Sequence, residues 1–255
     1  MADLTFRNYT SQQAASYATH RGGYEPDIYH EVLAYHTSQG GDLDTVFDVG
    51  CGTGGATRQL AVYFARAAGC DPGREMIAKA IELGPGTEGK AAHWFEIDLF
   101  WHQAARMVKP GGTVALWTKS SLYCHPSTPN VSNVQRALSH LEDDVLGPYE
   151  LTANNISRTM YVSLRMPWSV DPPTAEFPQA LSVRREWNKD GKLEPGQDDF
   201  YGGSSAMTLE DLANGLGTSS MVTRWRRGPS RTGRHRWRLR GTDHESGFRS
   251  HGVRD

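Results

Sequence analysis

Cysteine is scarce in this chain, and no long apolar run accompanies its most glycine-rich motif. Cys51, Cys70 and Cys124 show no C-x-x-C spacing and are too few for a disulfide framework, so they indicate neither secretion nor a zinc site. The run from Leu60 to Ala65 is far too short to cross a bilayer. The amino end, MADLTFRNYT, lacks a basic segment followed by an apolar one. We therefore expect a soluble, cytoplasmic protein with no membrane partner and no bound metal.

Positive charge is scarce in most of the chain and concentrated at its end. Residues 224–255 contain ten arginines and three acids, whereas residues 1–223 contain 17 basic and 26 acidic residues. Arg234, Arg236, Arg238 and Arg240 alternate around Trp237 and would neutralise phosphates, but one tryptophan provides no stacking platform. The tail also lacks apolar periodicity, so we expect a disordered segment rather than a nucleic-acid interface.

Apolar spacing predicts an alternation of short helices and strands in the first half of the chain. The expected elements are two helices within 10–36, strand 45–49, helix 55–64, strand 65–70, helices 73–83 and 96–108, and strand 113–118. Beyond residue 120 the sequence is rich in loops, with helices expected over 133–145 and 208–216 and a strand over 181–187. Residues 45–71 thus form a β-α-β unit.

This alternation predicts an α/β fold with a Rossmann-like, doubly wound sheet. We divide the chain into an N-terminal helical lid (1–40), a Rossmann-like nucleotide-binding core (41–119), an acceptor-side cap with the C-terminal part (120–223), and the arginine-rich tail (224–255).

The stretch DVGCGTGG, residues 48–55, satisfies two fingerprints. Gly50, Gly52 and Gly55 fit the G-x-G-x-x-G form of dinucleotide-binding proteins. Asp48 with Gly50, Gly52 and Gly54 fits acid-x-G-x-G-x-G, a form found in S-adenosylmethionine-dependent methyltransferases. Glycines allow a sharp strand-to-helix turn and a close approach of backbone to ligand. A structural turn without a ligand is the plain alternative.

Two acids bear on this choice. Asp71 ends the second strand, where a carboxylate can accept both ribose hydroxyls, which serves either ligand. Asp48 stands beside the glycines, where its charge would repel a pyrophosphate and attract the ammonium and sulfonium groups of S-adenosylmethionine. Asp48 therefore favours the methyl donor.

A turn, Lys109-Pro110-Gly111-Gly112, precedes the strand expected over 113–118. Together with DVGCGTG, it makes the chain resemble the class I S-adenosylmethionine-dependent methyltransferases over roughly residues 6–226. The segment AAHWF at 91–95, followed by FWHQAARMVKPGGTVALW, makes it similar to their small-molecule branch, the fungal type related to trans-aconitate methyltransferase.

The resemblance assigns roles to residues by position. Asp48, Gly50, Gly52 and Gly54 would hold the methionine part of S-adenosylmethionine, and Asp71 would hold its ribose. Other residues implied at the donor are Met76, packed on the adenine, and the lid residues Tyr17, Arg21 and Tyr24. Surface-helix positions are an equal alternative for the lid residues.

The acceptor, a small metabolite, would meet a second group of residues. His93 and Trp94 fall where the family places residues facing the reacting methyl, although a structural histidine and a packed tryptophan fit equally well. Tyr123 and His125 follow the carboxyl end of an expected strand, where doubly wound folds bind ligands, and simple loop structure is their alternative. A hydroxyl acceptor would need His93 or His125 as a base, whereas a carboxylate would need none.

Two departures from the family pattern affect the predicted activity. The interval from Asp71 to Lys109 is too short for the strands and crossover expected there, and the arginine-rich tail replaces the usual final helix and hairpin. A noncatalytic or truncated methyltransferase-like protein is thus the alternative from another class. A dinucleotide-dependent oxidoreductase is the third hypothesis, but no Tyr-x-x-x-Lys pair supports it.

Overall fold

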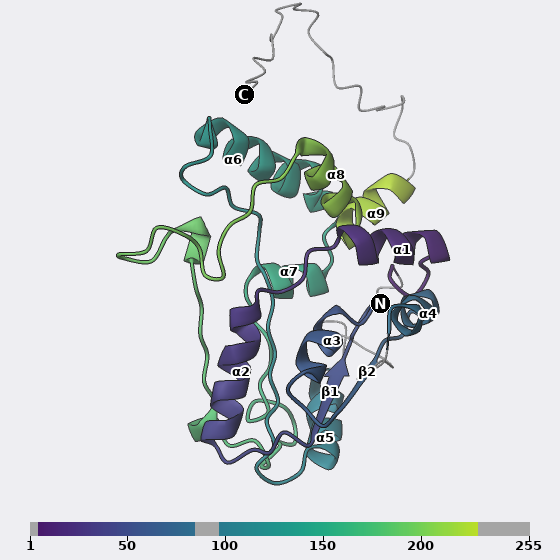
Figure 1. Ribbon diagram of the computed structural model, residues 1–255, viewed down its shortest axis with the longest axis vertical. Helices are drawn as coiled ribbons and strands as arrows, with labels where there is room; N and C mark the ends of the chain where they lie inside the picture. The colour runs from purple at the N-terminus through teal and green to yellow at the C-terminus, as the bar shows by residue number, and fades with distance from the viewer. Residues whose placement is uncertain (1–4, 85–96, 229–255) are drawn as a thin grey trace, which may run out of the picture.

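The computed structural model describes residues 5–84 and 97–228, which form many helices and one small parallel sheet that lies to one side of them (Figure 1). The first part contains α1 (Ser11–His20), α2 (Pro26–Ser38), β1 (Thr45–Val49), α3 (Gly55–Ala61), β2 (Arg66–Cys70) and α4 (Arg74–Glu82). The second part contains α5 (Ile97–Met107), α6 (Val131–His140), η2 (Leu141–Val145), η3 (Gly147–Tyr149), α7 (Thr152–Arg158), η4 (Gln179–Leu181), η5 (Lys189–Gly191), α8 (Leu209–Gly217) and α9 (Ser220–Arg227).

The predicted β-α-β unit is confirmed as β1, α3 and β2. The two strands are parallel, and Asp48 lies opposite Gly69 at the carboxyl end of the pair. The Gly50 N–H donates to the Cys70 carbonyl at 2.7 Å, so the glycine loop is tied to the end of β2. This pairing places the residues after β1 and after β2 at one edge of the sheet.

The N-terminal helices predicted within 10–36 are present as α1 and α2. α1 begins at a capping box in which Thr10 and Gln13 exchange hydrogen bonds. Tyr9, Ala14 and Met76 are buried together, so α1 packs on α4. This contact holds the start of the chain close to the glycine loop.

The sheet is smaller than the predicted doubly wound sheet. Within 5–84 and 97–228 only β1 and β2 pair, and the strand predicted over 113–118 is wrong. That segment lies along α2 instead: Thr113 Oγ1 is 2.9 Å from His36 Nδ1, and the Trp117 ring meets Tyr29 edge-on at 6.2 Å. An apolar run predicts burial but does not select its partner, and here the partner is a helix.

The strand predicted over 181–187 is also wrong. η4 ends at Leu181, and the following residues are irregular. Arg185 pairs with Glu31 on α2, and the Trp187 ring stacks on Tyr201 at 4.1 Å. Side-chain contacts of this kind anchor the segment in place of a strand ladder.

The C-terminal helices agree with the predictions in part. The helix expected over 133–145 is α6 continued by the π-helix η2, and the helix over 208–216 is α8, capped by Thr208 with Asp211. Residues 224–227, which the sequence analysis counted with the arginine-rich tail, belong to α9. Met221 and Val222 anchor α9 by packing against Leu146. Residues 229–255 lie outside the described chain, and the proposed domain boundaries stay predictions.

Candidate functional site

The glycine loop turns the chain from β1 into α3 through three left-handed residues. Gly50, Gly52 and Gly54 have φ of 94°, 55° and 80°, a conformation that disfavours any residue with a Cβ. Gly55 is the first residue of α3, and a Cβ built there would meet no atom within 4 Å. The three glycines of the acid-x-G-x-G-x-G form are therefore the ones that the backbone conformation requires. At Gly55, the third glycine of the dinucleotide fingerprint, a side chain would fit without a clash.

Asp48 caps the helix that follows this loop. Thr57 Oγ1 donates to Asp48 Oδ2 at 2.6 Å, and the Thr57 N–H also donates to this carboxylate. Burial raises the pKa of the Asp48 carboxyl, the Thr57 hydrogen bonds lower it, and the negative charge of Asp71 raises it again. A carboxylate thus already occupies the N-terminus of α3, the place where a dinucleotide fold receives its pyrophosphate.

Asp71 binds the other side of the loop. Its carboxylate accepts the Gly52 N–H at 3.1 Å and the Gly73 N–H at 2.8 Å. Burial raises the pKa of Asp71 in spite of these two hydrogen bonds, which lower it. Asp48 and Asp71 are therefore two half-buried carboxylates at the glycine loop whose charges repel each other, and a cation near them would relieve this repulsion.

Two of the residues predicted to contact the methyl donor, Met76 and Tyr17, lie directly over Gly52. A Cβ built on Gly52 would be 3.5 Å from Met76 Cε and 3.8 Å from Tyr17 Cε1. The Arg21 guanidinium carbon lies 5.8 Å from the centre of the Tyr17 ring. α1 is fixed here by Ser11, whose hydroxyl donates to Glu75 on α4 at 2.5 Å. The structure thus brings Tyr17, Met76 and the glycines together, while their roles toward a donor stay predictions.

The third lid candidate, Tyr24, belongs to a neighbouring aromatic group with Tyr29 and Trp117. The Tyr24 and Trp117 rings meet edge-on at 5.9 Å. Burial raises the pKa of Tyr24 and raises that of Tyr29 to about 12, and the charge of Asp48 adds to both shifts. This group therefore lies within electrostatic reach of the donor side of the loop. The sequence analysis missed Trp117, although its place at the end of an apolar run was a usable signal.

Residues that support the loop were missed as well. A Cβ on Gly69 would lie 2.9 Å from both Cys51 Cβ and Thr57 Oγ1, so this glycine lets α3 approach the sheet closely. Thr57 is fully buried and holds Asp48. A glycine inside a predicted strand is a recognisable sign of close approach, whereas nothing local marks Thr57 as the partner of Asp48.

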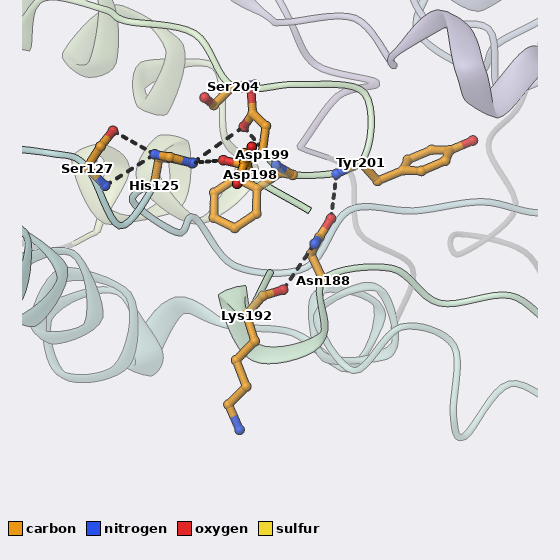
Figure 2. A network of polar contacts seen from close by, with 9 residues as sticks. His125, Ser127, Asn188, Lys192, Asp198, Asp199, Tyr201 and Ser204 are labelled. Carbon is orange, nitrogen blue, oxygen red and sulfur yellow. Dashed lines mark hydrogen bonds and ion pairs between the residues drawn. The ribbon is translucent and has the colours of Figure 1, made fainter. Parts of the chain in front are cut away.

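His125 joins two loops through both of its ring nitrogens (Figure 2). Nδ1 accepts the Ser127 N–H at 3.2 Å, so Nε2 carries the proton and donates to the Asp198 carbonyl at 2.9 Å. The Asp199 carboxylate lies 3.8 Å from Nε2. These contacts support the alternative of loop structure, and the catalytic role of His125 stays a prediction.

The remaining acceptor-side predictions lie apart or outside the description. Tyr123 lies against η5, where a Cβ on Gly191 would overlap its ring, and it is 38% exposed. His93 and Trp94 fall in residues 85–96, outside the described residues. Within 5–84 and 97–228, no group of three or more His, Cys, Asp or Glu is arranged to hold a metal ion. No helix in these same ranges has the length and apolarity needed to span a membrane.

Comparison with known sequences assigns the glycine loop to a broad class. Residues 46–144 match the family described as a methyltransferase domain. Over 123 residues the chain is 28% identical to a putative methyltransferase of Dictyostelium discoideum, covering 40% of this chain and 46% of that protein. Over 133 residues it is 25% identical to a probable S-adenosylmethionine-dependent methyltransferase of Saccharomyces cerevisiae, covering 41% and 45%.

These similarities support a methyltransferase domain in residues 46–144, and the Saccharomyces cerevisiae relative points to S-adenosyl-L-methionine as the cofactor of such a domain. The matched segment contains β1 from Val46 onward, the glycine loop, Asp48 and Asp71. The chain spans less than half the length of the two curated relatives. Activity, acceptor and partners of the whole protein are therefore treated below as proposals.

Proposed function

We propose that this protein transfers the methyl group of S-adenosylmethionine to an oxygen of a small metabolite, either a carboxylate or a hydroxyl. The observation that supports this most strongly is the Asp48 carboxylate at the N-terminus of α3, beside three left-handed glycines. The charge of Asp48 favours a cationic ligand and opposes a phosphate group, which disfavours the dinucleotide hypothesis.

The residues around the loop fit such a donor. Asp48 and Asp71 offer negative charge to an ammonium or sulfonium group. Burial raises the pKa of both carboxyls, and the charge of Arg7 offsets this rise only in part at Asp71. Asp71 would accept the ribose hydroxyls with the lone pairs that the Gly52 and Gly73 N–H groups leave free. Met76, already beside Gly52, would pack on the adenine.

The donor supplies a methyl group that its sulfonium already activates. The protein then needs to hold the donor, align the acceptor oxygen and keep water out. Asp48 and Asp71 would perform the first task through charge and hydrogen bonds. Tyr17 on α1, already over Gly52, would exclude water from the loop.

The acceptor would lie on the side of the aromatic group Tyr24, Tyr29 and Trp117. Lys119 follows this group, with its Nζ 5.5 Å from the centre of the Tyr24 ring and 3.4 Å from Glu25 Oε1, so a carboxylate acceptor would share this charge with Glu25. A carboxylate acceptor fits the resemblance to the branch of trans-aconitate methyltransferase and needs no base. For a hydroxyl acceptor, His93 or His125 would supply the base, with Trp94 and Tyr123 beside the substrate.

Calorimetric titration of the folded protein with S-adenosylmethionine, with its demethylated product and with a nicotinamide dinucleotide tests the proposal. We expect heat from the first two ligands and none from the third. Transfer of radiolabelled methyl to a panel of small carboxylic acids and alcohols then tests catalysis. Absence of binding to the donor and its product by folded protein would reject the proposed function.

A noncatalytic, methyltransferase-like protein is the second candidate, because only two strands pair in the described chain. This candidate predicts binding of the donor without transfer to any acceptor. Melting with and without the donor distinguishes it from a protein that binds nothing, since a bound ligand raises the melting temperature.

A further inference from the structure

A cavity of about 150 Å³ lies where α1 meets the C-terminal helices α8 and α9, and neither Asp48 nor Asp71 lines it. Figure 1 shows these three helices converging at one end of the described chain. The cavity is lined by Tyr9, Gln13, Ser16, Gly217, Thr218, Thr223, Arg226 and Arg227. A water molecule takes about 30 Å³ in the liquid, so the space suits a ligand of a few heavy atoms.

The lining of the cavity is positively charged. Arg226 and Arg227 contribute two guanidinium groups, and none of the lining residues is acidic. Neither arginine forms an ion pair with a carboxylate among residues 5–84 and 97–228. The Arg227 contact in this region is with the Gln13 amide oxygen at 3.5 Å, which is long for a hydrogen bond and leaves the charge uncompensated.

Helix geometry directs these groups to one place. Thr223, Arg226 and Arg227 are three and four residues apart on α9 and therefore share a face. Gln13 and Ser16 share a face of α1 by the same spacing. Arg226 reaches back over the end of α8, because a Cβ on Gly217 would lie 3.4 Å from both of its terminal nitrogens.

The polar groups at the bottom of the cavity are already engaged. The Tyr9 hydroxyl donates to the Thr218 carbonyl at 3.0 Å and lies 3.3 Å from Thr223 Oγ1. Thr223 Oγ1 donates to the Ser219 carbonyl at 2.9 Å. The hydrogen-bond donors that remain for a ligand are the two guanidinium groups, the Gln13 amide nitrogen and the Ser16 hydroxyl. This set suits a ligand that has negative charge and accepts hydrogen bonds.

We propose that this cavity binds a small oxyanion, such as phosphate or a short dicarboxylate, through Arg226 and Arg227 of α9 and Gln13 and Ser16 of α1. Planar guanidinium groups pair with the oxygens of carboxylate and phosphate in a forked geometry. A bound anion would link α1 to α9. Because Tyr9 forms a wall of the cavity and also packs with Met76, this link would steady the helix that covers the glycine loop.

The full chain is titrated with inorganic phosphate, with succinate and with chloride at matched ionic strength, while backbone amide shifts are followed by NMR. We expect phosphate, succinate or both to shift the amides of Ser16 and Gly217 in a saturable way, and chloride not to. The anion that binds more tightly identifies the ligand class. No saturable shift at these amides with either anion would overturn the proposal.

The matched variants are Arg226→Gln/Arg227→Gln in the cavity and Arg106→Gln/Arg136→Gln elsewhere, which remove the same charge from exposed positions on α5 and α6. The cavity pair should weaken anion binding by about tenfold or more, since charge-assisted hydrogen bonds are lost. The control pair should leave it unchanged. Equal weakening by both pairs would mean that anions sense only the net charge. Donor binding is not part of this readout, so its result is independent of the proposed methyl transfer.

Discussion

The region up to Glu82 and the region from Ile97 onward are each stabilised by a different kind of contact. In the first region, β1 and β2 share a parallel ladder, and Asp48 and Asp71 attach the connecting loop to neighbouring backbone. In the second region, single side chains reach distant carbonyls, as Trp101 does to Arg165 and Tyr161 does to Trp117. The first region therefore resists change through repeated backbone pairing, and the second depends on individual side chains.

The largest effect should come from truncating one of these anchors. Trp101 is 3% exposed, contacts the Phe177 ring at 5.7 Å and donates from Nε1 to the Arg165 carbonyl at 3.0 Å. Trp101→Ala should lower the free energy of unfolding by about 3–5 kcal/mol, because it opens a cavity and leaves a carbonyl without its donor. Urea denaturation measures this loss.

Leu99→Ala on the same helix is the matched control, because Leu99 is 54% exposed. It should change the free energy of unfolding by about 0.5 kcal/mol or less. If both variants lose the same stability, Trp101 is not an anchor and the contrast between the regions fails.

In the first region, the comparable weak point is Gly69, where α3 packs closely against the backbone of β2. Gly69→Ala would place a Cβ 2.9 Å from Cys51 Cβ and Thr57 Oγ1, so α3 must move away from β2. We expect a loss of about 1–3 kcal/mol, as for other overpacked sites, together with weaker donor binding because the Thr57–Asp48 contact shifts. Chemical denaturation and calorimetric titration check the two effects.

Gly55→Ala serves as the control for Gly69→Ala, since a Cβ there meets no atom within 4 Å. It should be neutral or slightly stabilising, because alanine favours the helix over glycine. A strong loss at Gly55 would indicate the close helix–strand packing of the dinucleotide fingerprint and would weaken the choice of methyl donor.

The carboxylate pair predicts a distinct pH dependence of donor binding. The pKa values of Asp48 and Asp71 are raised, so both carboxylates gain protons at a higher pH than an ordinary aspartate, whose pKa is about 3.9. Affinity for a cationic donor should therefore begin to fall while exposed aspartates are still charged. Calorimetric titration from neutral to acidic pH measures this fall.

Stability without donor should follow the opposite trend. A raised native-state pKa means that the folded protein binds these protons more tightly than the unfolded chain. The contribution of Asp48 and Asp71 to stability then decreases as pH rises from their ordinary pKa through their raised values. Asp48→Asn should reduce this slope, and an unchanged slope would show that Asp48 is not held in its buried environment.

Apart from the control variants, the smallest effect on stability is expected at His125. His125→Ala removes the contacts to Ser127 and Asp198 but leaves both loops in solvent, so it should lower the free energy of unfolding by about 1 kcal/mol. Hydrogen exchange at the two loops would detect the loosening. A fall of about 100-fold or more in kcat with unchanged KM would instead establish His125 as the base for a hydroxyl acceptor.

The sequence predicted the first region well because its contacts follow local patterns. Asp48 and the three glycines lie within seven residues, and the charge of Asp48 beside them favoured the methyl donor where the glycine spacing fitted both fingerprints. α1, α3 and α4 also followed from apolar spacing, as did α8 of the second region with its capping threonine. In such segments each residue meets partners a few positions away.

The second region was predicted less well because its partners are remote in sequence. Residues 113–118 have the apolar run of a buried strand, but Trp117 packs on α2. Trp187 stacks on Tyr201, and Arg224 donates to the Tyr149 carbonyl, which extends helix α9 into the expected tail. No periodicity encodes which loop a side chain will meet.

The most direct test of the central claim compares Asp48→Asn with Asp44→Asn in calorimetric titrations with S-adenosylmethionine at neutral pH. Asp44 is a partly exposed acid just before β1 that pairs with Arg66 and Lys109, so its replacement removes the same charge away from the loop. Loss of the Asp48 charge should weaken donor binding by about 10- to 100-fold, in the range of a charged hydrogen-bonded contact. Asp44→Asn should bind as the unaltered protein does. Equal affinity of the Asp48 variant and the unaltered protein would contradict the claim that this carboxylate selects a cationic donor.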